Sequence, residues 1–146
     1  MLTANDIAKY FLALSNDEDS GELISNLKLQ KLVHYAQGFH LALYDQPLFD
    51  ECIEAWAHGP VIPDLYHLYK RYGSGSIPPA TDFDPNIYTQ EVKELLDEVF
   101  SVYGQFSAWK LRALTHDESP WKNAYNRKNK VISQDELKEY FKTLLN

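Results

Sequence analysis

The segment that spans residues 26–44 constrains the fold more strongly than any other part of the sequence. Apolar side chains recur in it every three or four residues, which is the period of an α-helix. Its apolar residues, which extend around much of the helical circumference, are Leu29, Leu32, Val33, Tyr35, Ala36, Phe39, Leu41, Ala42, Leu43 and Tyr44. A helix that is apolar on several sides packs against several neighbours. We therefore predict a central helix over residues 26–44.

Four residues stand out within this helix. Lys28 and Lys31 occupy the remaining face near its start, where we expect them to point outward. His40 falls on the apolar stripe, and a histidine there is typically a hydrogen-bonded core residue. Gly38 lowers helix propensity by about 1 kcal/mol relative to Ala, so we expect another helix to cross closely at that point.

Capping residues and apolar periodicity predict further helices along the chain. With their caps, the expected helical segments cover residues 3–14, 63–72, 89–104, 107–114, 119–125 and 133–144. Thr3 or Asn5 caps the first of them, and Ser133 with Glu136 forms a capping box for the last. Residues 16–21 are expected to form an acidic loop, and residues 74–86 a long surface loop.

Two short segments favour strands. Residues 51–57 alternate between polar and apolar side chains, as a half-buried strand does. Residues 58–63 are expected to form a rigid turn, and residues 131–132 a second short strand that pairs with 52–56. The predicted fold is mainly α: a compact single-domain helical bundle of about six to seven helices with a minor short β-ribbon, forming one domain over residues 1–146.

The charge balance argues against nucleic acid as the main ligand. The chain has 14 Lys and Arg against 21 Asp and Glu, for a net charge of −7. Because proteins bind duplex nucleic acid mainly by neutralising phosphates with cations, direct nucleic-acid binding is not expected. The basic clusters are either solvated helix ends or a charged face for a partner. These clusters are Lys28, Lys31, Lys70, Arg71, Lys110, Arg112 and the turn 127–130.

The single cysteine and the N-terminal residues bear on location. Cys52 has no second cysteine to pair with, which is typical of the reducing cytoplasm, and its place in the alternating segment predicts a small buried hydrophobe. The first residues lack the basic and apolar regions of a secretory signal. No apolar run approaches the roughly 18 residues that span a membrane. We therefore expect a cytoplasmic protein with no membrane partner.

Patterns for catalysis or metal binding are weak. His34 and His40 are separated by about 240° around a helix, so they do not face one ion. A Cys–His pair of Cys52 with His58 or His116 is conceivable, but a reactive thiol needs a cationic, accessible setting. The Gly-Ser run at residues 73–76 lacks the lysine of a phosphate-binding loop. The sequence therefore predicts no enzyme, no cofactor and no metal site.

Several segments, in order, resemble the Panacea domain, also called the SocA-like or phage-associated GepA-like domain. They are Leu29-Gln30-Lys31-Leu32-Val33-His34-Tyr35-Ala36-Gln37-Gly38, then Glu54-Ala55-Trp56-Ala57-His58-Gly59-Pro60-Val61, then Thr115-His116-Asp117-Glu118-Ser119-Pro120-Trp121, and then Ile132-Ser133 with Glu136-Leu137. The resemblance covers residues 3–142. Some members carry an additional partner segment or DNA-binding elements, and none is recognisable in this sequence.

The resemblance implies a bacterial or prophage antitoxin. Members of the family neutralise diverse toxins by direct contact, some of which modify transfer RNA and halt translation. One member instead acts as an adaptor that delivers its toxin to the ClpXP protease. We therefore expect an antitoxin of a type II toxin–antitoxin system, with a toxin encoded by a neighbouring gene as partner. The alternatives are a ClpXP adaptor, a DNA-binding autoregulator, and an enzyme that uses His116 with Asp117.

The motif residues are expected to serve mainly the fold. The motif residues that we expect to be structural are Leu29, Leu32, Tyr35, Gln37, Trp56, Gly59, Pro60, Val61, His116, Pro120 and Trp121. Gln30, Lys31 and Gln37 are polar on a largely apolar helix, so they either satisfy buried backbone groups or face the partner. The candidate partner-binding residues are Gln30, Lys31, Tyr66, His67, Lys70, Arg71 and Tyr72. An acidic surface around residues 17–19 and 91–98 is expected to attract a cationic toxin.

Overall fold

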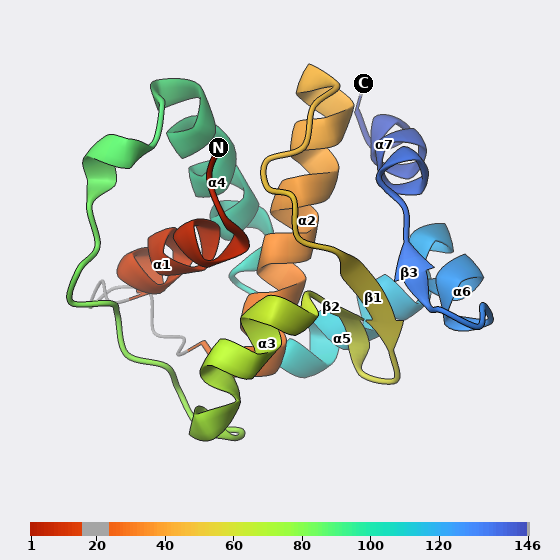
Figure 1. The fold of residues 1–146 in the computed structure, drawn as a ribbon, viewed down its shortest axis with the longest axis horizontal. Helices are drawn as coiled ribbons and strands as arrows, with labels where there is room; N and C mark the ends of the chain where they lie inside the picture. Colours follow the sequence, from red (N-terminus) through yellow and green to blue (C-terminus); the bar gives the residue numbers. More distant parts are fainter. Residues whose placement is uncertain (16–23, 146) are drawn as a thin grey trace.

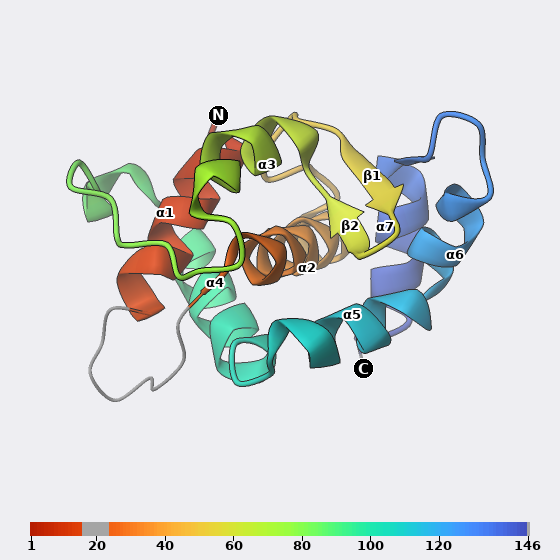
Figure 2. The ribbon, with the colours of Figure 1, turned by 90° about the horizontal axis from the view of Figure 1, so that it is seen from below.

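The helix α2 (Asn26–Tyr44) runs through the middle of the molecule, and the other elements surround it (Figures 1 and 2). The computed structural model describes residues 1–15 and 24–145. Within these ranges α2 contacts α1, α3, α4, α5, α7 and β2. The predicted central helix is confirmed, with the same first and last residues.

Six further α-helices and three short strands complete the described ranges. The helices are α1 (Ala4–Ser15), α3 (Pro63–Tyr69), α4 (Gln90–Tyr103), α5 (Ala108–His116), α6 (Ser119–Tyr125) and α7 (Gln134–Lys142). The strands are β1 (Ile53–Trp56), β2 (Gly59–Val61) and β3 (Val131–Ile132), and 3₁₀ turns occupy Lys70–Tyr72 and Pro85–Ile87. The predicted mainly α class with a minor β component is confirmed.

Local capping explains where the helices begin. The Thr3 hydroxyl accepts from the Asp6 N–H at 3.1 Å, and the Asp6 carboxylate accepts from the Thr3 N–H at 2.8 Å. Such reciprocal bonds satisfy N–H groups that have no partner inside the helix. The predicted caps Thr89 and Ser107 and the capping box at Ser133 are also confirmed. Thr3, not Asn5, caps the first helix.

Gly38 marks the crossing of α2 and α7, as predicted. A Cβ atom at this position would overlap the ring of Phe141, which lies on α7 and is fully buried. The absence of a side chain therefore lets the two helices approach closely. The remaining buried apolar residues form one cluster around α2. The division of the chain into a single domain stays a prediction.

The three strands form an antiparallel sheet in the order β2-β1-β3. The predicted pairing of 131–132 with the first strand is confirmed, since Ile53 lies opposite Ile132. The prediction that residues 58–63 form only a turn is wrong, because Gly59–Val61 is a strand. Gly59 adopts a φ of 122°, which favours glycine and lets the chain reverse at once after β1. Pro60 is tolerated because β2 is an edge strand.

The burial of the two α2 lysines contradicts the sequence prediction. Lys28 and Lys31 are only 2% and 1% exposed. Lys31 lies beneath Gly59 of β2 and beside Thr115 of α5. Lys28 Nζ donates to the Gly104 carbonyl oxygen at 2.7 Å, across the end of α4.

His40 and Cys52 also differ from expectation. The core histidine of α2 is His34, whereas His40 is half-buried, with Nδ1 2.6 Å from the Gln46 carbonyl oxygen. His40 lies near the end of α2, where fewer elements surround the helix. Cys52 is exposed because it precedes β1 rather than belonging to it.

The long loop after α3 is confirmed as a surface excursion. Ile77 anchors it: its side chain is buried, and its N–H donates to the Ile24 carbonyl oxygen at 2.9 Å. The predicted acidic loop at residues 16–21 lies outside the described residues.

Candidate functional site

The motif glutamines of α2 both bind backbone groups. Gln30 Oε1 accepts from the Ile62 N–H at 3.0 Å, just before α3 begins. Gln37 Oε1 accepts from the Leu48 N–H at 2.7 Å, and its Nε2 donates to the Phe49 carbonyl oxygen at 2.8 Å. Both side chains are buried. The sequence left open whether these glutamines satisfy buried backbone groups or face a partner. In the structure they satisfy buried backbone groups.

The third motif segment holds the β1–β2 turn. Trp121 Nε1 donates to the Trp56 carbonyl oxygen at 2.8 Å, and His116 Nε2 lies 2.9 Å from the Ala57 carbonyl oxygen. Because a carbonyl oxygen only accepts, His116 Nε2 carries the proton and donates. The His116 and Trp121 rings pack edge to face, with centroids 3.9 Å apart. Burial lowers the pKa of His116, which favours the neutral ring.

Lys31 fills the space beneath the hairpin. A Cβ atom on Gly59 would lie 2.9 Å from Lys31 Cε and 3.1 Å from Thr115 Oγ1. The first three of the four motif segments therefore meet at one point. Lys31 Nζ donates to the Leu27 carbonyl oxygen at 3.1 Å. Burial, reinforced by the nearby Arg112 charge, lowers the pKa of Lys31 to about 8.

Glu118 is a half-buried carboxyl group for which the sequence predicted no role of its own. Its Oε2 accepts from the Tyr35 hydroxyl at 2.9 Å, and burial raises its pKa to about 7. Tyr35 stacks on Tyr103 with centroids 4.0 Å apart. The only sequence signal for Glu118 is its place directly before Ser119-Pro120, at the N-cap position of α6.

Three buried side-chain atoms among the described residues lack a hydrogen-bond partner: His34 Nδ1, Arg112 Nε and Glu118 Oε1. Burial, together with the nearby Lys31 charge, lowers the pKa of His34 to about 3, so the ring is neutral. In the described part of the chain no group of three His, Cys, Asp or Glu side chains is arranged to hold a metal ion.

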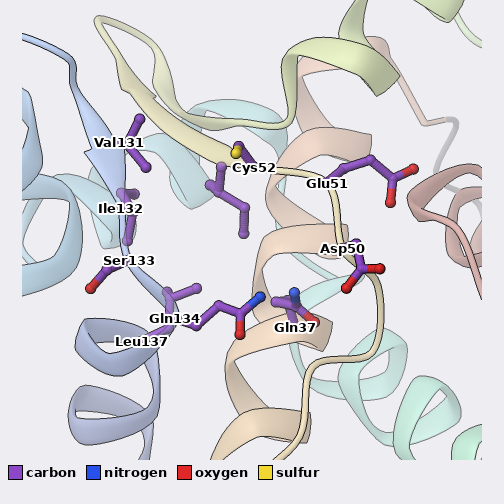
Figure 3. Close-up of a pocket in the computed structure, with 10 residues that line it drawn as sticks. Gln37, Asp50, Glu51, Cys52, Val131, Ile132, Ser133, Gln134 and Leu137 are labelled. Atoms are coloured by element: carbon purple, nitrogen blue, oxygen red, sulfur yellow. The ribbon is translucent and has the colours of Figure 1, made fainter. Parts of the chain in front are cut away.

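A small cavity of about 160 Å³ lies between α2, residues 50–53, β3 and α7 (Figure 3). Two of its polar side chains are already engaged elsewhere in the chain. Glu51 points toward α1, where Oε2 accepts from the Ala4 N–H at 3.1 Å, and the Gln37 amide is bonded to backbone. Cys52 lies at the edge of the cavity without a neighbouring histidine. This arrangement does not assemble a nucleophile with a base.

The predicted partner-binding residues divide into two groups. His67, Lys70 and Arg71 are exposed on α3 and the following 3₁₀ turn, with Tyr66 and Tyr72 half-buried beside them. The Tyr66 ring packs edge to face on Trp56, and the Arg71 guanidinium lies 4.9 Å from the Tyr72 ring centroid. These residues are neighbours along α3 and the 3₁₀ turn that follows it, and their role in binding stays a prediction.

Gln30 and Lys31 do not belong to that surface. They are 0% and 1% exposed, so neither side chain is available to a partner in this structure. The expectation of an outward contact through them needs correction, because their polar atoms bond within the chain. The motif residues expected to be structural are placed as follows: Leu29, Leu32, Tyr35, Gln37, Gly59, Pro60, Val61 and Pro120 are buried, and Trp56, His116 and Trp121 are half-buried.

These contacts define a small, mainly helical protein whose motif side chains are bonded to its own backbone. Residues 29–122 match the family described as "Antitoxin SocA-like, Panacea domain". The chain belongs to this family, and the resemblance noted in the sequence is confirmed.

One curated relative is the "Antitoxin SocA" of Caulobacter vibrioides (strain NA1000 / CB15N). It is 32% identical over 109 residues, which cover 67% of this chain and 58% of the relative. The chain therefore spans less than two thirds of that relative's length. No solved structure shows significant similarity to this chain. Within the described ranges, no helix has the length and apolar character needed to cross a membrane.

Proposed function

We propose that this chain is an antitoxin that neutralises a cognate toxin by direct protein–protein binding. Membership of the antitoxin SocA-like family supports this role. The structural observation that most supports this proposal concerns the motif side chains. Four of them contact backbone atoms of the chain itself: Gln30, Gln37, His116 and Trp121. Motif residues that bond within the chain stabilise the fold. The surface outside the motif is therefore available to bind a partner.

The exposed side chains suit protein recognition. Trp109 is 74% exposed, and the Arg112 guanidinium lies 4.9 Å from its ring centroid. Tyr, Trp and Arg are the residues that most often carry binding energy at interfaces. The surface formed by Tyr66, His67 and residues 70–72 offers the same residue types. Neither feature requires catalysis, a cofactor or a metal, and we propose that the protein acts without them.

The net charge of −7 indicates the kind of toxin. A toxin that modifies transfer RNA needs a cationic surface, and an acidic antitoxin would be attracted to it and would exclude the nucleic acid. Such an encounter takes place in the cytoplasm, where we propose that this chain acts. The association rate is then expected to fall as salt screens the charges.

Co-expression with the product of the neighbouring gene tests the proposal. Direct neutralisation predicts restored growth and a stable complex that co-purifies. Restored growth with loss of the toxin, reversed in cells without ClpXP, would identify an adaptor instead. A gel shift with the chain's own promoter would reveal autoregulation.

Catalysis is tested by a His116→Gln variant, in which the amide can replace the donor to the Ala57 carbonyl oxygen. Direct binding predicts unchanged neutralisation by this variant. Failure of the unmodified chain to restore growth or to form a complex would contradict the antitoxin role.

A further inference from the structure

An apolar groove runs between α2 and α4. The two helices lie side by side (Figures 1 and 2). The groove has a volume of about 240 Å³. Its apolar lining comprises Phe39 and Leu43 of α2, Leu95, Val99 and Val102 of α4, and Leu145.

Two of the apolar residues that line this groove are well exposed to solvent. Leu43 is 48% exposed and Val102 is 40% exposed, and Tyr44 beside Leu43 is 38% exposed. Soluble proteins rarely leave a contiguous apolar patch uncovered unless it binds something. Leu43 belongs to the apolar set that predicts the central helix, so only the structure reveals its exposure.

A row of carboxylates borders the groove. Glu91, Glu94 and Glu98 are exposed and follow each other at spacings of three and four residues, so they share one side of α4. Glu98 lines the groove itself. Glu91 and Glu94 lie near the end of α2, since their charges contribute to raising the pKa of Tyr44. The row therefore extends along the groove for about 10 Å.

Cations at this end of the molecule do not neutralise the row. The α7 lysines Lys138 and Lys142 act on Asp45, and Lys138 forms an ion pair with it. Glu91 and Glu98 are paired with no cation in the described part of the chain, and Glu94 accepts only from the Gln90 amide. The groove thus combines an apolar floor with one negatively charged border.

We propose that the α2–α4 groove binds a basic amphipathic helix of the cognate toxin. The apolar face of such a helix would cover the exposed side chains of Leu43 and Val102, and its Lys or Arg side chains would reach the glutamate row. This mode of recognition, a helix laid into an apolar groove, is common between proteins. A second copy of this chain fits less well, because dimerisation through the groove would bring two rows of glutamates together.

The identity of the partner rests on the proposed function, but the chemistry of the groove is testable without it. The probe is a synthetic helical peptide of about 14 residues, which spans about 21 Å. Leu forms one face of the peptide and Lys the other, and a matched peptide carries Glu in place of Lys. We expect the Lys peptide to bind the unmodified protein at least about tenfold more tightly than the Glu peptide at low salt.

Two substitutions locate the binding. Val102→Asp should weaken binding of the Lys peptide at least about tenfold, since it places a charge on the apolar floor at an exposed position. Glu98→Lys should weaken binding mainly at low salt. Its matched control is Glu139→Lys, the same reversal at an exposed position of α7, which should leave binding unchanged. Equal binding of the two peptides, or equal binding by Val102→Asp, would overturn the proposal.

The same variants separate this inference from the antitoxin role. If the groove binds the toxin, Val102→Asp should fail to restore growth on co-expression with the neighbouring gene, whereas Glu139→Lys should restore it. Circular dichroism must show that both variants are folded. Restored growth with Val102→Asp would reject the groove as the toxin site and leave the antitoxin role standing.

Discussion

Replacement of Gly38 by alanine tests the packing that organises this fold. Alanine has the higher helix propensity, by about 1 kcal/mol, so at an exposed helical position the change would stabilise the protein. At Gly38 the new methyl group would overlap the Phe141 ring. That ring is enclosed by Tyr35, Phe39 and His34, with centroids 5.9, 4.8 and 5.9 Å away, so it has little room to move aside.

The sign of the effect follows from these magnitudes. Overpacking of a core costs about 1–3 kcal/mol, and the enclosed ring places Gly38→Ala near the upper end of that range. After the gain in helix propensity, we expect a net loss of about 2 kcal/mol in the free energy of unfolding. In a Phe141→Leu background the overlap is relieved, and the same change should be neutral or stabilising.

Urea denaturation of the four proteins of this double-mutant cycle measures the coupling. Ser101→Ala, at an exposed position within α4, is the control for helix propensity alone and should stabilise slightly. A stabilising Gly38→Ala in the unmodified background would refute the close α2–α7 crossing.

Three further changes test the buried polar contacts. His34 contributes stability that should be lost as the pH falls from about 6.5 toward 3, because the unfolded chain binds a proton at His34 that the folded chain, with its lowered pKa of about 3, does not. The raised pKa of Glu118 acts in the opposite direction, so the comparison with a His34 variant isolates this contribution. The contribution lost between these two pH values is about 5 kcal/mol in the free energy of unfolding. Urea denaturation at several pH values should show a smaller loss for His34→Leu than for the unmodified protein. An identical pH profile for the two proteins would contradict the prediction. Gln30→Leu should cost about 1–3 kcal/mol, because it leaves the Ile62 N–H buried without an acceptor, and thermal unfolding at constant pH checks it. Trp121→Phe should lower the free energy of unfolding by about 1 kcal/mol through loss of the hydrogen bond to the Trp56 carbonyl oxygen. Amide hydrogen exchange around the β1–β2 turn should accelerate in this variant. Unchanged exchange would argue against a stabilising role of this hydrogen bond.

The helical elements could be predicted because their signals are local. Thr3 and Asp6, or Ser133 and Glu136, exchange hydrogen bonds across three residues. The bounds of α2 follow in the same way from its apolar period and from Ser25, whose hydroxyl accepts from the Lys28 N–H. Such contacts join residues within one or two turns of the same helix. They can therefore be predicted from sequence without knowledge of the tertiary structure.

The candidate site was less predictable, because its contacts join distant parts of the chain. The Gln30–Ile62 bond spans 32 residues, and the Trp121–Trp56 bond spans 65. Sequence reasoning left the glutamines between two roles, since a buried amide and an interface amide look the same in a helical pattern. It left Lys31 between the same two roles, because a lysine that bonds a carbonyl beneath a hairpin carries no local signal.

Local signals along the chain were sufficient to predict the helices, their caps, the pairing of the first and last strands, and the motifs of the antitoxin SocA-like family. Which face of each helix meets solvent depends on the assembled fold. Lys31 is buried because Gly59 of β2 and Thr115 of α5 lie over it, and Lys28 is buried against the end of α4. Leu43 and Val102 are exposed because no element in the described part of the chain covers the α2–α4 groove. Hydrophobic pattern determines which residues gain from burial, but the arrangement of neighbouring elements determines which of them are covered.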